Sequence, residues 1–340
     1  MNNSRQPTRQ NATAIHVEDP LYGTVTLETP VLIDLYHSHA VQRLAHIYQA
    51  GITAFINPVR STTRLDHSLG VVALLQRFGA HPVEQAAGLI HDVPHTAFSH
   101  VVDFVFPNHE HDYHEQQRER VLAASDLPEV FARHGLDWRF VAEAENFSLL
   151  EQPLPALCAD RLDYFLRDAV TLRLATVAEV REVLAHLGVW NHRIVANDLD
   201  AAHWLADRYL QTDDHLWCST QEVGWYAVMA RALKTALDGG IITEQDLQST
   251  DQEIMSRLRA ARHPEIHRWL DLLRLDVQFV RDDSQPDLVA LPKVRTIDPP
   301  VLSHGQVRPL SELDPVFLQR RIETIASKQG QWRLRIETRQ

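Results

Sequence analysis

The stretch that decides the fold is HDVPHTAFSH, which occupies residues 91–100 and holds three imidazoles and a carboxylate. It follows the apolar run AAGLI at residues 86–90, which we expect to end a buried helix that begins near Val83. A buried carboxylate is costly unless it is paired or bound to a cation, so His91 and Asp92 are best satisfied as joint ligands of a metal ion. Pro94 then turns the chain ahead of a short helix expected over residues 96–106.

Two other predicted helices carry residues that suit the same metal ion. His67 heads the apolar stripe of a helix expected from Arg64 to Phe78, and Asp160 lies on a helix expected over residues 157–168. Taken singly, these residues are compatible with a buried core histidine and with an ordinary salt-bridged helix. Taken together with His91 and Asp92, they give an ordered H…HD…D pattern on three separate helices.

The remaining elements indicate a mainly α protein. We expect helices over residues 30–48, 115–124, 200–236 and 251–273, and strands over residues 24–27, 189–196, 277–280, 288–291, 294–297 and 332–336. The pattern predicts four regions: a disordered lead (1–14), a helical core (15–175), a helical extension of that core (176–275) and a small α+β C-terminal region (276–340).

Composition restricts the partners. The chain has 340 residues, a formal net charge of -12 and 44% hydrophobic residues, as expected of a globular protein that does not take nucleic acid or an anionic membrane as its main partner. Its two cysteines predict no disulfide framework, and neither a signal peptide nor a membrane span is apparent, so we expect a cytoplasmic protein. A small anionic substrate held by a metal ion is compatible with this charge.

The ordered pattern resembles the HD superfamily of metal-dependent phosphohydrolases. The motifs around it resemble the branch that hydrolyses deoxynucleoside triphosphates, which includes the SAM- and HD-domain enzyme and bacterial dGTP triphosphohydrolases. The resemblance covers residues 17–175, about half of the chain, and rests on Asp19-Pro20 with Tyr22-Gly23, Gln42-Arg43-Leu44, Gln49, the run Arg64–Gly70, His95 with Phe98-Ser99-His100, His114-Glu115-Gln116, and Asp160–Tyr164 with Arg167-Asp168. It implies an HD-domain helical core with a small α+β C-terminal appendage, a nucleotide or other small phosphoester as substrate, and a homo-oligomer.

The resemblance also implies roles for individual residues. One divalent transition metal (Mn, Fe, Co, Ni or Zn) would be bound by four ligands, with Mg as an additional ion that accompanies the substrate; the ligands are His67, His91, Asp92 and Asp160. Metal-bound hydroxide would attack phosphorus, with His95, His100 and His114 around the scissile phosphate. We expect His100 to donate the proton to the leaving oxygen, oriented by Asp103, while Glu115 orients His114. Arg64 and Arg161 match phosphate contacts, and Gln49, Tyr164 and Asp168 match contacts on the sugar side.

Two departures from the family pattern leave alternatives open. Pro94 stands where the family has glycine before its second histidine, and residues 209–223 offer one imidazole and three carboxylates where triphosphohydrolases carry cations. The sequence therefore supports phosphoester hydrolysis better than it supports a triphosphate substrate. The resemblance makes a dNTP triphosphohydrolase-like enzyme the leading hypothesis, with a nucleoside monophosphatase or other small phosphoester hydrolase as the alternative. Outside this class, an HD-type di-iron oxygenase would need a second metal on His95, His100 and His114, and a non-catalytic nucleotide-binding protein would retain the scaffold without turnover.

Overall fold

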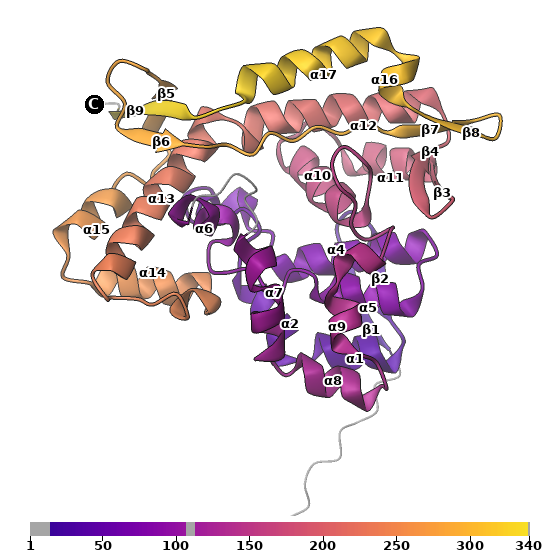
Figure 1. The fold of residues 1–340 in the computed structure, drawn as a ribbon, viewed down its shortest axis with the longest axis horizontal. Coiled ribbons are helices and arrows are strands. Elements are labelled where there is room, and N and C mark those ends of the chain that lie inside the picture. Colours follow the sequence, from indigo (N-terminus) through magenta and orange to yellow (C-terminus); the bar gives the residue numbers. More distant parts are fainter. Residues whose placement is uncertain (1–13, 107–112, 339–340) are drawn as a thin grey trace, which may run out of the picture.

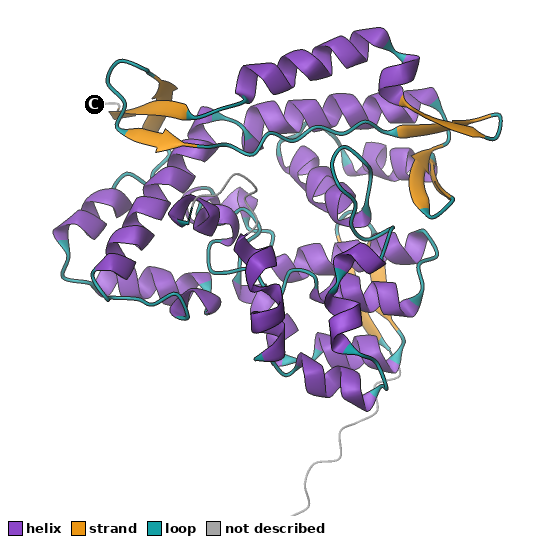
Figure 2. Cartoon of the chain, in the orientation of Figure 1, coloured by secondary structure: helices purple, strands orange, loops and turns teal. Residues whose placement is uncertain are grey.

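The computed structural model describes residues 14–106 and 113–338, so residues 1–13 of the predicted disordered lead lie outside the described part. Within these ranges the chain is mainly helical, as the sequence predicted, and its strands form small sheets at the periphery (Figures 1 and 2). No helix of the described residues is long and apolar enough to cross a membrane.

The N-terminal part begins with a hairpin of β1 (Ile15–Asp19) and β2 (Gly23–Leu27), paired in antiparallel register from Ile15 opposite Leu27 to Asp19 opposite Gly23. The sequence predicted the second strand and missed the first. Asp19 closes the turn between them, because its carboxylate accepts the backbone N–H groups of Leu21 at 2.8 Å and Tyr22 at 3.0 Å.

The helices of the core follow this hairpin in the chain. They are α1 (Pro30–Tyr36), α2 (His39–Arg43), α3 (Thr53–Ile56), α4 (Arg64–Arg77), α5 (Pro82–Ile90), α6 (Val102–Val105), α7 (Tyr113–Ala123), α8 (Leu127–Arg133), α9 (Trp138–Ala142) and α10 (Ala159–Thr171). The single helix expected over residues 30–48 is broken between α1 and α2. Ser38 is extended there and its hydroxyl accepts the N–H of Val41, so it begins a new helix as an N-cap.

The packing of α4 against α5 and α10 brings together the residues of the H…HD…D pattern. Gly70 permits the close approach of α10, because a Cβ at this position would lie 2.0 Å from Oδ1 of Asp163. The same glycine therefore explains how a residue of α10 reaches the histidine one turn earlier on α4.

The extension is also helical, with one β-hairpin. It contains α11 (Val177–Ala185), β3 (Leu187–Trp190), β4 (Arg193–Ala196), α12 (Leu199–Thr212), α13 (Thr220–Asp238), α14 (Asp251–Ala260) and α15 (Pro264–Leu270). A π-helical turn at Asp213–Trp217 separates α12 from α13, where the sequence predicted one helical region. Such turns are rare and occur often at functional sites.

The C-terminal region adds strands to both ends of the extension. It contains β5 (Val277–Arg281), β6 (Leu288–Ala290), β7 (Pro300–Ser303), β8 (Gln306–Pro309), α16 (Leu310–Leu313), α17 (Pro315–Lys328) and β9 (Trp332–Thr338). The sheets have the orders β5-β9-β6 and β3-β4-β7-β8, and β7 pairs in parallel with β4. Helix α17 runs alongside α12, and ion pairs of Arg320 with Asp207 and of Lys328 with Asp213 join this helix to α12 and to the π turn (Figure 1).

The strand expected over residues 294–297 does not form. Residues 291–299 instead run without regular structure between β6 and β7, and Thr296 and Ile297 are buried. The β-branched residues that suggested a strand here lie in an irregular segment in which the adjacent Thr296 and Ile297 are both buried.

Candidate active site

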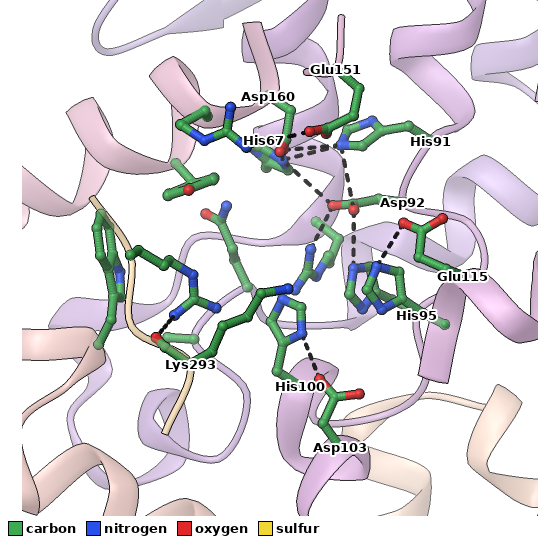
Figure 3. Close-up of a pocket in the computed structure, with 18 of the residues that line it drawn as sticks. His67, His91, Asp92, His95, His100, Asp103, Glu115, Glu151, Asp160 and Lys293 are labelled. Atoms are coloured by element: carbon green, nitrogen blue, oxygen red, sulfur yellow. Dashed lines mark hydrogen bonds and ion pairs between the residues drawn. The ribbon is translucent and has the colours of Figure 1, made fainter. Parts of the chain in front are cut away.

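The predicted site residues come together around one cavity of about 980 Å³ (Figure 3). This volume is at the upper end of the range typical of small-molecule sites. Every residue that the sequence assigned to metal binding, catalysis or substrate contact lines this cavity: Gln49, Arg64, His67, His91, Asp92, His95, His100, Asp103, His114, Glu115, Asp160, Arg161, Tyr164 and Asp168.

His67, His91 and Asp160 form a compact group that could hold a metal ion. Nε2 of His67 lies 2.9 Å from Oδ1 of Asp160 and 3.3 Å from Nε2 of His91, and the distance from His91 Nε2 to Asp160 Oδ1 is 3.5 Å. The Asp92 carboxylate completes the group, with oxygens 3.7 Å from His67 Nε2 and 3.4 Å from His91 Nε2. The three predicted helices thus contribute side chains to one point.

The outer nitrogens of the two imidazoles determine which atoms face this point. Nδ1 of His91 donates a hydrogen bond to the carbonyl of Gly88 at 2.7 Å, and Nδ1 of His67 donates to Oδ2 of Asp163 at 2.6 Å. In neutral imidazoles both Nε2 atoms then carry lone pairs, which face each other and a carboxylate. A cation between them satisfies all of these groups, and imidazoles fixed by a carboxylate or a carbonyl on the far side are the usual arrangement around a bound metal.

Asp92 and Arg64 form a second buried contact. NH1 of Arg64 donates to Oδ2 of Asp92 at 2.8 Å, and its Nε donates to the hydroxyl of Ser99 at 2.9 Å. Nε2 of His95 lies 3.2 Å from the other oxygen of Asp92. Arg64 and His95 therefore contact a candidate metal ligand directly, and their contacts fix the orientation of the Asp92 carboxylate.

A second histidine group lies beside the first. The ring of His95 stacks on that of His114 at a centroid distance of 4.0 Å, and the ring of His100 packs edge-on against both. Asp103 accepts a hydrogen bond from Nδ1 of His100 at 3.0 Å, and Glu115 lies 3.1 Å from Nε2 of His114. Each of the two carboxylates therefore lies beside the histidine that the sequence assigned to it. The ring nitrogens of this group are also close enough together to hold a metal ion.

The two histidine groups differ in their electrostatics. Burial opposes the charged form of His67, but the hydrogen bonds to Asp160 and Asp163 raise its pKa to about 10. Burial likewise opposes ionisation of Asp160, yet its bonds to His67 and His91 hold the pKa of that carboxyl well below its usual range. By contrast, burial lowers the pKa of His95 well below the ordinary value and that of His100 to about 3. The first group attracts positive charge, whereas His95 and His100 are neutral near pH 7.

The loop that carries His95 and His100 is held from the extension. The two carboxylate oxygens of Asp251 accept the backbone N–H of Tyr48 at 2.8 Å and that of Phe98 at 2.6 Å. Phe98 and Ser99 are both left-handed, with φ of 60° and 52°, a strained conformation for these residues. This strained turn interrupts the helix expected over residues 96–106, which is regular only over a 3₁₀ turn and α6.

Arg43 connects the same loop to the extension. Its guanidinium donates to the carbonyls of Val93 and His95 on one side and to those of Gln248 and Ser249 on the other, at 2.6 to 3.1 Å. These hydrogen bonds fix the carbonyls on either side of Pro94. His95 therefore keeps its position in the cavity although proline, rather than the glycine of the family, precedes it.

The residues expected on the substrate side have several partners within the protein. Arg161 donates to the carbonyls of Ala156 and Gln152, and Asp168 accepts from Nε1 of Trp217 at 2.8 Å. The hydroxyl of Tyr164 is hydrogen-bonded to that of Tyr209 at 2.7 Å. These side chains form a wall of the cavity on the side of α10 and the π turn.

Sequence reasoning missed several residues that line or support the site. Asp163 orients His67, and its signal was its position three residues after Asp160 on one helix. Glu151 lies beside Asp160, and burial together with this neighbour raises its pKa to about 7. Further lining residues that the sequence did not assign include Arg60, Trp217, Glu222, Tyr226, Lys293 and Arg295.

Comparison with known proteins identifies the family. The HD domain family matches residues 64–168. YdhJ, an uncharacterised protein of Bacillus subtilis, is 38% identical over 288 residues, which cover 84% of this chain and 88% of that protein. The metal-dependent phosphohydrolase cns2 of Cordyceps militaris is 35% identical over 328 residues, which cover 94% of each protein. This chain therefore belongs to the HD-domain family of metal-dependent phosphohydrolases, and it is a hydrolase.

Other similarities are more distant. A phosphohydrolase from Bacteroides thetaiotaomicron has the same fold, with a TM-score of 0.65, 16% sequence identity, and coverage of 96% of this chain and all of that one. The deoxynucleoside triphosphate triphosphohydrolase SAMHD1 of Gallus gallus is 30% identical over 152 residues, which cover 38% of this chain and 25% of that protein. Membership of the family implies a divalent metal, and the group of His67, His91 and Asp160 has the donor atoms to hold it.

Proposed function

We propose that this protein removes a single phosphoryl group from a nucleotide, with a divalent metal held by His67, His91, Asp92 and Asp160. The observation that carries the metal site is the pair of Nε2 atoms 3.3 Å apart, each with its Nδ1 committed to an acceptor on the far side. When bound, such a metal lowers the pKa of water and offsets the charge of the phosphoryl group.

The residues of the second histidine group suit proton transfer. Asp103 fixes the ring of His100 through Nδ1 and thereby leaves Nε2 to exchange a proton with the leaving oxygen. Because His100 is neutral in the free protein, it becomes an acid when the negative charge of a bound phosphate raises its pKa. The role of His95 differs from that of His100, because its Nε2 contacts Asp92 and positions that carboxylate.

The charge of the cavity supports a substrate with one phosphate. Nine carboxyl side chains and six lysine or arginine side chains of the described residues line it. Four of those six cations are ion-paired with carboxylates: Arg60, Arg64, Arg118 and Arg161. A triphosphate carries about four negative charges, and each unpaired charge held near like charges in a partly dry pocket costs on the order of 1 kcal/mol or more.

The size and walls of the cavity support a nucleotide as the carrier of that phosphate. The rings of Tyr164, Trp217 and Tyr226 line it, and aromatic faces are suitable surfaces for a nucleobase or a sugar. Of these three lining rings, those of Tyr164 and Trp217 are in edge-to-face contact, with centroids 5.3 Å apart.

A triphosphohydrolase is the second candidate, and one observation favours it. The match to SAMHD1, named as a deoxynucleoside triphosphate triphosphohydrolase, includes about 30% identity over the part of the chain that it covers. In this case the enzyme would release intact triphosphate rather than orthophosphate.

A single panel separates these candidates. Purified protein supplied with Mn, Fe, Co, Ni or Mg is tested on nucleoside mono-, di- and triphosphates and on a generic phosphodiester, with products resolved by chromatography. We expect orthophosphate from a nucleoside monophosphate, and no turnover by His67→Ala. Release of intact triphosphate from a dNTP would support the second candidate, and two coupled irons with oxygen uptake would support an oxygenase instead.

A further inference from the structure

Lys293 is a cation that the C-terminal region supplies to the active-site cavity. It lies in the irregular segment between β6 and β7, far in sequence from every residue of the H…HD…D pattern, and it lines the cavity together with Pro292 and Arg295. Figure 3 shows its side chain reaching into the site toward His100. The sequence provided no functional interpretation of this region.

The backbone around Lys293 is fixed by neighbouring elements. Its carbonyl accepts hydrogen bonds from the thiol of Cys218 at 3.3 Å and from NH1 of Arg295 at 3.2 Å. Further along the segment, the N–H of Asp298 donates to the carbonyl of Pro155 at 3.0 Å, and Ile297 is buried in the main core. The direction of the Lys293 side chain therefore follows from an anchored segment.

Lys293 differs from most arginines of the cavity in its partners. Within the described residues neither its ammonium nor the guanidinium of Arg295 has a carboxylate within ion-pair distance, whereas Arg64 is paired with Asp92 and Arg161 with Glu151. Burial lowers the pKa of Lys293, and the neighbouring charge of Arg295 lowers it further. An anion bound beside it would relieve both effects.

We propose that Lys293 binds the phosphoryl oxygens of the substrate on the side of the cavity opposite His91. This assignment rests on the proposed function, since it takes the substrate to be a phosphoester. An ammonium group and a phosphoryl oxygen form a charge-assisted hydrogen bond, which is stronger than a neutral one. The small C-terminal region, which the HD-domain match does not include, thus completes the substrate site.

The experiment compares variants of the full-length, metal-loaded protein. Lys293→Met removes the charge and keeps much of the side-chain volume, Lys293→Arg restores the charge, and Lys234→Met is the matched control on an exposed lysine of α13 that pairs with Asp238. We expect Lys293→Met to lower kcat/KM for a nucleoside monophosphate about 10- to 100-fold. Lys293→Arg should recover most of this loss, and the metal content of all three variants should equal that of the wild type.

A binding measurement gives a readout that does not depend on turnover. The chain has three lysines, so reductive methylation with ¹³C-formaldehyde gives few lysine signals in an NMR spectrum, and Lys293→Arg assigns the one of interest. Titration with inorganic phosphate should shift the Lys293 signal and leave the Lys234 signal in place.

The outcomes separate this inference from the proposed function. Turnover by the wild type together with an unchanged kcat/KM in Lys293→Met would overturn the role of Lys293 and leave the function standing. Absence of phosphoester turnover in the wild type, with the Lys293 signal still responding to phosphate, would overturn the function and support the anion site. A Lys293 signal that does not respond to phosphate would overturn the anion site.

Discussion

Substitution of Asp163 tests whether its hydrogen bond to Nδ1 of His67 orients that imidazole for metal binding. Asp163 is fully buried, accepts from Nδ1 of His67 at 2.6 Å, and accepts from Nε of Arg167 at 2.8 Å. In Asp163→Asn the amide oxygen can still accept from His67 and Arg167, but it carries no full negative charge, so the bond that keeps the His67 proton on Nδ1 becomes weaker. The tautomer with its proton on Nε2 then gains population, and it lacks the lone pair that faces the metal position.

The expected loss follows from two magnitudes. A hydrogen bond to a charged group contributes about 1.5–3 kcal/mol, and removal of such a supporting partner typically costs 10–100-fold in metal affinity. We therefore expect Asp163→Asn to weaken metal binding about 10- to 100-fold. Competition with a chromophoric chelator measures the dissociation constant directly, without any assumption about the substrate.

Asp19→Asn provides the matched control. Asp19 accepts from NH2 of the same Arg167 at 2.6 Å and, within the described residues, makes no hydrogen bond to His67. Both variants disturb the Arg167 network, so we expect similar losses in the free energy of unfolding. The reasoning is refuted if Asp163→Asn binds metal as tightly as the wild type, or if Asp19→Asn loses as much metal affinity as Asp163→Asn.

Three further predictions concern proton transfer, pH and the attachment of the C-terminal region. His100→Gln should retain the wild-type metal content and lower kcat about 10²- to 10⁴-fold, and an unchanged kcat would exclude it as the proton donor. Burial raises the pKa of Asp251 to about 7, above an unfolded value of about 3.9, so ionisation of this carboxyl destabilises the folded state as the pH rises from 4 to 7. Asp251→Asn should flatten that part of the pH dependence of the unfolding free energy, and an unaltered slope would contradict this. Lys328 pairs with the buried Asp213 at 2.5 Å, so Lys328→Met should lower the unfolding free energy by about 3–5 kcal/mol in urea denaturation, whereas a loss like that of Lys234→Met would show that the pair contributes little.

The helical core and the residues of the site follow from local patterns in the sequence. His67 and Asp160 could be placed on helices because apolar residues recur at helical spacing around them, and the ordered pattern added a reason for the helices to meet. A capping box of Thr63 and Asp66 begins α4 at Arg64, the residue at which the sequence predicted this helix to begin.

What the sequence missed depends on contacts between distant segments. The support of the His95 loop by Asp251 joins residues 153 positions apart, and the entry of Lys293 depends on how the segment after β6 crosses the extension. Local propensity carries no information about such contacts. The π turn at Asp213–Trp217 was also missed, but the break that follows it has a local signal, because the hydroxyl of Ser219 accepts the N–H of Glu222 and begins α13 as an N-cap.

Our proposal requires one divalent metal on His67, His91, Asp92 and Asp160 for phosphoester hydrolysis. The most direct measurement is the metal content and the phosphate release of the same sample, before and after chelation and after metal is restored, with His67→Ala in parallel. We expect about one metal ion per chain, loss of metal and phosphate release together on chelation, recovery of both on reloading, and neither in His67→Ala. Full phosphate release from metal-free protein, or from His67→Ala without bound metal, would contradict it.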